Sequence, residues 1–326
     1  MSIDESLVPN EDTGPQAAVP AVISPAVPGA ISLPSSPARW LPAAIRTTRP
    51  RQWPKNLLVF AAPLAAGSLG RDHGFAYALL AMLAFACASA AVYFVNDVVD
   101  VERDRRHPVK RNRPIASGAL PERHAVVLAG LATVFAVGAG AVIREPLLVA
   151  TVVAYLGESF LYSFRLKHVP FVEMVLVASG FLLRVLGGAA ATHVHLSIWF
   201  LLVCSLGAFG VAIAKRYTEL TSLGQDAVRH RPVMRWYRPG VLRAWQLIVG
   251  LGMLATYLMW AVNETTAARP WHLLSALPLA AALIRFGALT ARQTVSPVED
   301  LIMRDATMLC FEVGWLALFC VGLSVA

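Results

Sequence analysis

The chain alternates long apolar stretches with short polar connections. The apolar stretches cover residues 54–69, 75–95, 122–143, 146–164, 170–191, 196–214, 241–262, 270–290 and 305–325. Most of them approach the roughly 20 residues that an α-helix needs to cross a bilayer. The first is short, and Pro54 and Pro63 blur its ends. This pattern predicts an all-α polytopic membrane protein with about nine transmembrane helices.

The first 38 residues follow a different pattern. Seven prolines stand there among small residues, and the early charged residues are acids. Such a tract cannot form a stable helix, and a cleaved signal peptide would need a basic start and an unbroken apolar core. We therefore expect a disordered cytoplasmic tail over 1–38 and a transmembrane catalytic domain over 39–326.

Composition and charge narrow the class further. Hydrophobic residues make up 57% of the chain and charged residues 15%, against about 25% charged residues in soluble domains. The net charge of +8 is spread over the connections, which indicates topology and an anionic ligand and argues against nucleic acid. Alternate connections carry most of the Lys and Arg residues, so we expect a protein of the plasma (inner) membrane with its N-terminus in the cytoplasm and its C-terminus outside.

The strongest candidate site begins where the second apolar stretch ends. Asp97, Asp100 and Asp104 stand at i, i+3 and i+7, which places them on one face of a helix. Asn96 shares that face with Asp100. Carboxylates this close repel one another unless a cation lies between them, and Mg²⁺ typically binds through one or two carboxylates together with substrate phosphates. The motif therefore predicts a cytoplasmic Mg²⁺ site with Asn96, Asp97, Asp100 and Asp104 as ligands.

A run of basic residues follows these acids. The arginines among them can hold phosphate oxygens in bidentate fashion. Acidic and then basic residues at a membrane edge indicate a site for a metal-bound pyrophosphate. The run includes Arg103, Arg105, Arg106, Lys110, Arg111 and Arg113.

A second polar motif appears about 120 residues later, where the stretch 196–214 ends. Lys215 and Glu219 are i, i+4 and share a helix face. Each motif ends the first helix of a four-span unit, 75–191 and 196–325, which indicates an internal duplication with the two motifs facing each other across a central cavity. Arg184 and Glu173 are further intramembrane charges, for which substrate binding and helix tying both remain open.

Two motifs resemble a known family. The segment N-D-V-V-D-V-E-R-D at 96–104 resembles the NDxxDxxxD motif of the UbiA superfamily of intramembrane prenyltransferases. The segment R-P-I-A-S-G at 113–118 resembles that superfamily's RP-x-x-SG turn. The resemblance runs from about residue 46 to the end and implies a UbiA-like arrangement of helices.

Three further stretches resemble one branch of this superfamily, which transfers 5-phosphoribose from phosphoribosyl pyrophosphate to decaprenyl (polyprenyl) phosphate. They are R-P-R-Q-W-P-K-N at 49–56, Y-S-F-R-L-K at 162–167 and K-R-Y-T-E at 215–219. In the aromatic prenyltransferases the second motif is typically DxxxD, whereas here Lys215 replaces the first acid and only Glu219 is kept. A lysine at this position suits the extra phosphates of the donor and the lipid acceptor.

The resemblance implies a Mg²⁺-dependent membrane phosphoribosyltransferase. Its products would be pyrophosphate and decaprenylphosphoryl-5-phosphoribose, the precursor of a lipid-linked arabinose donor for cell-wall arabinan (arabinogalactan). A homo-oligomer is compatible with the sequence. We expect catalytic roles for Asp97, Asp100, Asp104, Lys215 and Glu219, and substrate-binding roles for Arg49, Arg51, Lys55, Asn96, Arg105, Arg106, Lys110, Arg111, Arg113, Tyr162, Lys167, Lys215 and Arg216.

Two other functions fit parts of the pattern. A UbiA-type prenyltransferase would use a polyprenyl diphosphate and an aromatic or other small acceptor, and Lys215 argues against it. A secondary transporter would also carry repeated polar sites between helices, but near the bilayer midplane instead of at the cytoplasmic edge.

Overall fold

The computed structural model describes residues 37–325, except 225 and 293–297. Over these residues the chain is all-helical, as the apolar pattern predicts. The tail predicted over 1–38 falls outside the described residues except for its last two positions, which begin the first helix. The elements are α1 (Pro37–Thr47), η1 (Pro50–Phe60), α2 (Ala61–Ala65), α3 (Gly74–Val99), α4 (Val101–Arg105), η2 (Lys110–Asn112), α5 (Glu122–Val142), α6 (Pro146–Phe164), η3 (Leu166–His168), α7 (Val172–Ala191), α8 (Ile198–Leu223), α9 (Asp226–His230), η4 (Pro232–Trp236), α10 (Pro239–Asn263), α11 (Arg269–Ala291), α12 (Val298–Arg304) and α13 (Ala306–Val325).

Eight helices in the described part of the chain are long and apolar enough to cross a membrane: α3, α5, α6, α7, α8, α10, α11 and α13. They match eight of the nine expected stretches. The remaining stretch, 54–69, forms the 3₁₀ helix η1 and the short helix α2. Proline lacks the N–H that an α-helical bond needs, so Pro54 inside η1 favours the tighter helix.

The 3₁₀ geometry also extends this segment. Eleven residues at about 2.0 Å each and five at about 1.5 Å give a length of about 30 Å, close to the thickness of the hydrocarbon core. This length includes the charged start of η1, and η1 and α2 are not among the eight candidate membrane spans of the described chain. The segment packs against α3 and α7.

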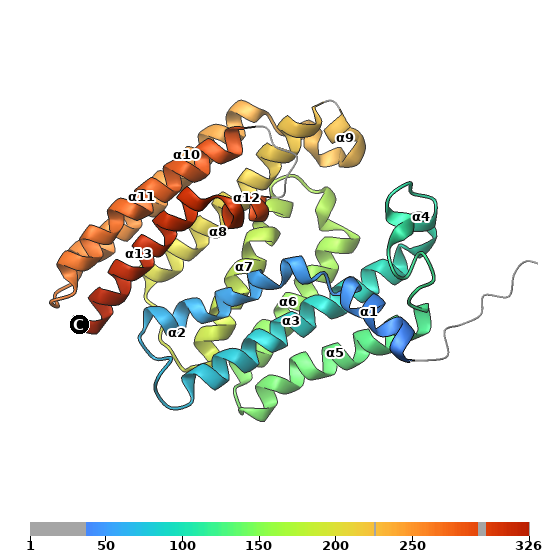
Figure 1. The fold of residues 1–326 in the computed structure, drawn as a ribbon. Helices are drawn as coiled ribbons and strands as arrows, with labels where there is room; N and C mark the ends of the chain where they lie inside the picture. Colours follow the sequence, from blue (N-terminus) through green and yellow to red (C-terminus); the bar gives the residue numbers. More distant parts are fainter. Residues whose placement is uncertain (1–36, 225, 293–297, 326) are drawn as a thin grey trace, which may run out of the picture.

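The eight long helices form two repeats. In the first, α3 contacts α5, α5 contacts α6, and α6 contacts α7; in the second, α8 contacts α10, α10 contacts α11, and α11 contacts α13. The repeats meet where α7 packs on α8. Short helices follow the first member of each repeat, namely α4 with η2 and α9 with η4. In Figure 1, α4 and α9 lie toward the same end of the bundle, away from the C-terminus. This arrangement agrees with the duplication inferred from the sequence.

Small residues allow the closest helix contacts. A Cβ atom at Gly188 of α7 would lie 1.8 Å from the backbone oxygen of Val59 in η1, and one at Gly187 would lie 2.3 Å from the ring of Phe85 in α3. Backbone-to-backbone approach of this kind is a common mode of packing between membrane helices. Gly188 therefore allows η1 to pack closely against α7.

The Gly188→Ala substitution tests this contact. The added methyl group meets backbone and cannot be accommodated by a side-chain rotation, so we expect a loss of about 1–3 kcal/mol in the free energy of unfolding. The matched control is Gly138→Ala, because a Cβ atom at Gly138 meets nothing within 4 Å. Thermal unfolding of both purified variants in detergent checks the prediction, and equal melting temperatures would contradict it.

Candidate active site

Two buried carboxylates and an arginine form the centre of the first polar site. Asp97 lies in the last turns of α3 and Asp104 in α4, and they are 3% and 1% exposed. Arg113 follows η2 and contacts both: its Nη1 donates to Asp97 Oδ1 at 3.2 Å and to Asp104 Oδ2 at 2.7 Å. The predicted helix face therefore does bring Asp97 and Asp104 together.

The other two residues of the predicted metal set lie differently. Helix α3 ends at Asp100, whose φ of −90° and ψ of 3° interrupt the helix before α4. The Asp100 carboxylate is 31% exposed and pairs with Arg103 at 2.5 Å. The Nδ2 of Asn96 donates to Ser163 Oγ in α6 at 3.0 Å. The structure thus unites two of the four predicted ligands.

Arg49 completes the first site from the opposite side. Its Nη2 donates to Asp97 Oδ1 at 3.0 Å, and its guanidinium lies over the ring of Tyr93 at 4.3 Å. The backbone of Arg49 has φ 56° and ψ 68°, in the left-handed region that non-glycine residues seldom adopt. Strain of this kind costs roughly 1–3 kcal/mol and clusters at functional sites. Here it turns the chain between α1 and η1 so that the guanidinium reaches Asp97.

A cavity of about 310 Å³ opens beside these groups. This volume is at the lower end of the range for small-molecule sites, about 300–1,000 Å³. Its lining combines cationic and acidic groups, as a site for a phosphorylated ligand requires. The lining residues are Arg46, Thr47, Arg49, Asp97, Val109, Asn112, Arg113 and Pro114.

The carboxylate pair fits a divalent cation. Asp104 Oδ1 is buried and has no hydrogen-bond partner, although buried polar atoms are nearly always satisfied. Within the part of the chain that the structure describes, no three His, Cys, Asp or Glu side chains lie together as metal ligands. Two carboxylates suit Mg²⁺, which commonly takes its other oxygens from water and substrate phosphates.

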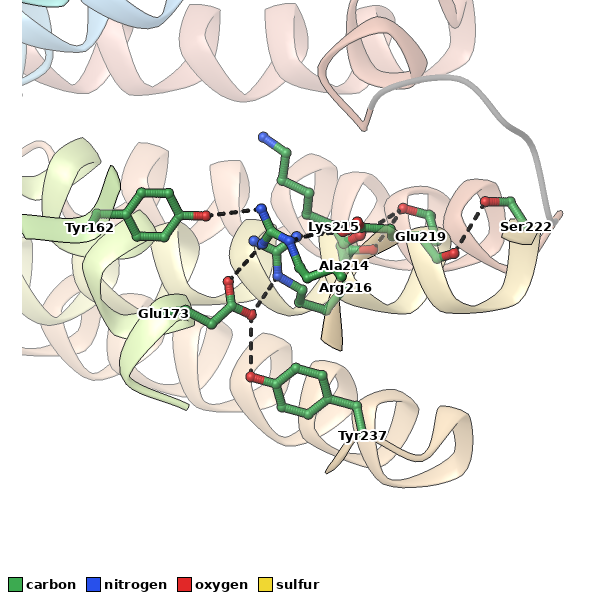
Figure 2. A network of polar contacts seen from close by, with 10 residues as sticks. Tyr162, Glu173, Ala214, Lys215, Arg216, Glu219, Ser222 and Tyr237 are labelled. Atoms are coloured by element: carbon green, nitrogen blue, oxygen red, sulfur yellow. Dashed lines mark hydrogen bonds and ion pairs between the residues drawn. The ribbon is translucent and has the colours of Figure 1, made fainter. Parts of the chain in front are cut away.

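The second polar site is built around a fully buried glutamate (Figure 2). Glu173, at the start of α7, is 0% exposed. It accepts hydrogen bonds from Arg216 Nε at 2.5 Å, Arg231 Nη1 at 3.1 Å and the Tyr237 hydroxyl at 3.2 Å. Arg216 also pairs with Glu219 at 2.5 Å. A buried charge is costly unless it is paired and hydrogen-bonded, and Glu173 meets both conditions.

Tyr237 remains a hydrogen-bond donor in this site. Burial and the neighbouring Glu173 raise the pKa of Tyr237 to about 12, even though the Phe171 N–H that donates to the phenol oxygen lowers it. The phenol is therefore protonated at physiological pH. It closes the Glu173 side of the cluster against the apolar core.

The second motif includes a buried arginine beside the predicted Lys215–Glu219 pair. Lys215 and Glu219 lie one turn apart in α8, as predicted, and Glu219 also accepts a hydrogen bond from the Arg216 guanidinium. The Lys215 side chain extends away from Glu173 (Figure 2). Because Arg216 is 4% exposed, it contributes to the buried base of the site, and Lys215 lies nearer its edge.

Helix α6 connects the two polar sites. Ser163 accepts the hydrogen bond from Asn96, which neighbours Asp97. The preceding residue, Tyr162, accepts a hydrogen bond from Arg231 Nη2 at 3.2 Å. Of these two successive residues, Ser163 contacts the first site and Tyr162 contacts the second. The two motifs therefore lie near each other, as the duplication predicts.

The remaining predicted basic residues surround this centre. Arg105 has a structural role, since it bonds to Glu102, Glu122 and the backbone oxygen of Ala116. The others vary in exposure on the connections and on η1. Arg51, Arg106 and Arg111 are exposed, and Lys55, Lys110 and Lys167 are half-buried.

Arg184 ties helices together. Its Nε donates to Asn56 of η1 at 2.8 Å, and its Nη2 donates to Ser89 of α3 at 2.9 Å and Tyr155 of α6 at 3.1 Å. Its Nη1 donates to the oxygen of Gly180 one turn earlier at 2.6 Å. The sequence left a substrate role open for this residue, and the contacts favour the helix-tying role. Glu173 pairs with other arginines instead of facing Arg184.

Arg231 and Tyr237 were missed by the sequence reasoning. A signal for Arg231 exists in the chain: R-N-R-P at 111–114 recurs as R-H-R-P at 229–232. Tyr237 has no comparable signal, because its role depends on how η4 folds against α7.

The fold and the site together define a polytopic α-helical membrane protein with two half-sites at one end. The first polar site, around Asp97 and Asp104, is the acidic half-site, and the second polar site, with Lys215, Arg216 and Arg231, is the basic half-site. A model of the UbiA prenyltransferase family matches residues 57–304. The chain belongs to this family and is a multi-pass membrane enzyme. This membership favours the two enzyme functions over the transporter.

Individual relatives agree with this assignment. The chain is 35% identical over 294 residues to the decaprenyl-phosphate phosphoribosyltransferase of Mycobacterium tuberculosis, covering 89% of this chain and 96% of that one. It is 32% identical to the enzyme of the same name from Corynebacterium glutamicum, with 86% of each chain covered. A UbiA homolog from Archaeoglobus fulgidus, solved bound to GPP and Mg²⁺, has a TM-score of 0.61 and 18% identity, and the match covers 87% of this chain and 99% of that one.

The Arg184→Leu substitution tests the tie between helices. It removes a buried charge and leaves Asn56 Oδ1 without its donor, while Ser89 and Tyr155 keep only their hydrogen bonds to other groups, so we expect the free energy of unfolding to fall by roughly 1–3 kcal/mol. The control is Arg123→Leu, since Arg123 is exposed in the first turn of α5. Thermal unfolding in detergent measures both. A similar small change in the two variants would contradict the structural role.

Proposed function

We propose that the chain transfers 5-phosphoribose from phosphoribosyl pyrophosphate to decaprenyl phosphate or a similar polyprenyl phosphate, releasing pyrophosphate. The similarity to decaprenyl-phosphate phosphoribosyltransferases over most of the chain carries this proposal. The charge of the two half-sites supports it. An acidic pair suits a metal-bound pyrophosphate, and a cluster with two arginines and a lysine suits further phosphate groups.

The acidic half-site would hold Mg²⁺ through Asp97 and Asp104. Mg²⁺ bound there would neutralise the charge that grows on the departing pyrophosphate. Asp100 and Asn96 remain predicted ligands, although Asp100 must first leave Arg103 and Asn96 must leave Ser163.

Arg49 and Arg113 would bind the pyrophosphate oxygens. Both guanidinium groups face Asp97 beside the cavity, and turning them toward the ligand exchanges one anionic partner for another. Bidentate arginine contacts also fix the orientation of the donor, and positioning is a large part of catalysis in group transfer.

The acceptor does not need a catalytic base. A phosphate monoester is already ionised at pH 7, with a charge of about −1.5 to −2. The chain therefore has to orient the lipid phosphate on the face of the ribose opposite the pyrophosphate, so that the anomeric configuration inverts. Lys215 and Lys167 are candidates for this contact. The polyprenyl tail would leave between the apolar helices into the bilayer.

The same charges support an orientation in the membrane. The basic connections lie on the side of the polar sites, which we assign to the cytoplasm of the plasma membrane, with the C-terminus outside. A cytosolic sugar phosphate and a membrane lipid can then meet at the bilayer edge.

The nearest alternative is a prenyltransferase that uses a polyprenyl diphosphate and a small acceptor, because the structural neighbours from Archaeoglobus fulgidus bind GPP or DMAPP. Labelled phosphoribosyl pyrophosphate and polyprenyl phosphate separate the two functions. The proposed enzyme converts the label into a lipid-soluble product, and the alternative does not.

The Asp97→Asn substitution tests the acidic half-site. It removes the charge that the metal and Arg113 share, so we expect at least about a hundredfold loss of turnover with unchanged membrane insertion. Chelation of divalent cations should abolish wild-type turnover, and added Mg²⁺ should restore it. The matched control is Glu102→Gln, since Glu102 is exposed in α4 and pairs only with Arg105 among the described contacts. Labelled lipid formed at the wild-type rate by the Asp97 variant would contradict the metal role.

A further inference from the structure

The internal duplication relates two arginines at equivalent positions. Arg113 follows Asp97 by sixteen residues, and Arg231 follows Lys215 by the same sixteen residues. Each arginine precedes a proline and then a buried β-branched residue, Ile115 at 1% exposure and Val233 at 2%. The equivalence is therefore structural as well as sequential.

The acids of the first half are lost in the second half. In the same alignment Lys215 takes the place of Asp97, Thr218 that of Asp100 and Ser222 that of Asp104. The arginine is kept while the potential metal ligands become a cation and two hydroxyl residues. The carboxylates that remain in the second half-site, Glu173 and Glu219, are paired with arginines, so the cationic groups there can hold an anion directly.

Glu173 orients the guanidinium groups of this half-site. Each of its two carboxylate oxygens binds a different arginine: Oε1 accepts a hydrogen bond from Arg216, and Oε2 accepts one from Arg231. Because Glu173 is 0% exposed, it is the fixed base of the cluster. The outer side is more open, since the side chains of Arg231 and Glu219 are 24% and 26% exposed. Arg231 Nε and Glu219 Oε1 are 3.9 Å apart there, beyond the usual hydrogen-bond distance.

We propose that Arg231, together with Arg216, binds the phosphate monoester of the donor, namely its 5′-phosphate. This assignment rests on the proposed function and divides the phosphates between the half-sites: pyrophosphate at Asp97 and Asp104, monoester at Arg216 and Arg231. Tyr162 adds a hydroxyl at the same edge. A terminal phosphate offers three oxygens, which matches two guanidinium forks better than a single lysine. Glu173 is a positioning residue.

Binding of two half-ligands tests the assignment. Ribose 5-phosphate carries only the monoester and magnesium pyrophosphate carries only the diphosphate, and calorimetry on the purified full-length chain measures each. We expect Arg231→Gln to weaken the affinity for ribose 5-phosphate about tenfold to a hundredfold. The affinity for magnesium pyrophosphate should stay within about twofold of the wild-type value, which is the error expected for independent sites. The control Arg235→Gln should change neither, because Arg235 is exposed and lies over the Trp236 ring.

A second variant distinguishes the loss of a binding contact from misfolding of the chain. Arg231→Lys keeps the charge next to Glu173 and loses the bidentate fork. It should therefore weaken the affinity for ribose 5-phosphate but not that for magnesium pyrophosphate, and by a smaller factor than Arg231→Gln. Equal weakening of both half-ligands, or of neither, overturns the assignment.

The outcomes also separate this assignment from the proposed function. Suppose that the wild-type chain forms labelled lipid and that the Arg231 substitutions do not change the affinity for ribose 5-phosphate. This result would overturn the assignment and leave the proposed function standing. A chain that binds ribose 5-phosphate through Arg231 and forms no labelled lipid leaves the assignment standing and counts against the proposed function.

Discussion

Charged groups buried at the membrane edge are the constraint on which the rest of the structure depends. Asp97, Asp104 and Glu173 are almost completely removed from solvent, and an isolated buried carboxylate would be too costly to keep. Each is stabilised by arginines that come from other parts of the chain. The connections after α3 and α8 therefore have to fold back over the helix ends, because they carry Arg113 and Arg231. The need to pair these charges thus determines the shape of this end of the bundle.

The fold follows largely from apolar periodicity. Eight expected stretches became long helices because a bilayer requires every backbone group to be bonded within its own segment. The ninth could not be predicted in detail. Prolines at positions 50, 54 and 63 signal an irregular segment, but its close approach to Gly188 of α7 joins distant parts of the chain, which no local pattern reveals. One helix end was also misjudged, since α8 continues to Leu223, past the polar motif that seemed to terminate it.

The site was predictable where the chemistry is local and less so where it depends on distant partners. The spacing of Asp97 and Asp104 was sufficient to place them together, because both belong to nearly continuous helix. Asp100 shares that spacing, but the helix break at its own position turns it toward Arg103. The pairing of Glu173 with Arg216 and Arg231 joins α7, α8 and the start of η4, and separations of 43 and 58 residues leave no periodic trace. Motif resemblance identified Arg216 as a binding residue without indicating that it is the buried member of the pair.

The two half-sites differ in charge, although they occupy equivalent positions in one duplicated scaffold. In the first, Asp97 and Asp104 balance Arg49 and Arg113, so the group is neutral and gains positive charge only when a cation arrives. In the second, Lys215, Arg216 and Arg231 outnumber Glu173 and Glu219, so the group is cationic without a metal. A ligand with a diphosphate at one end and a monoester at the other matches this difference, whereas a prenyl diphosphate has nothing to present to the second group. Under the proposed function, this divergence of charge between the repeats would favour a phosphorylated sugar over an isoprenoid as donor.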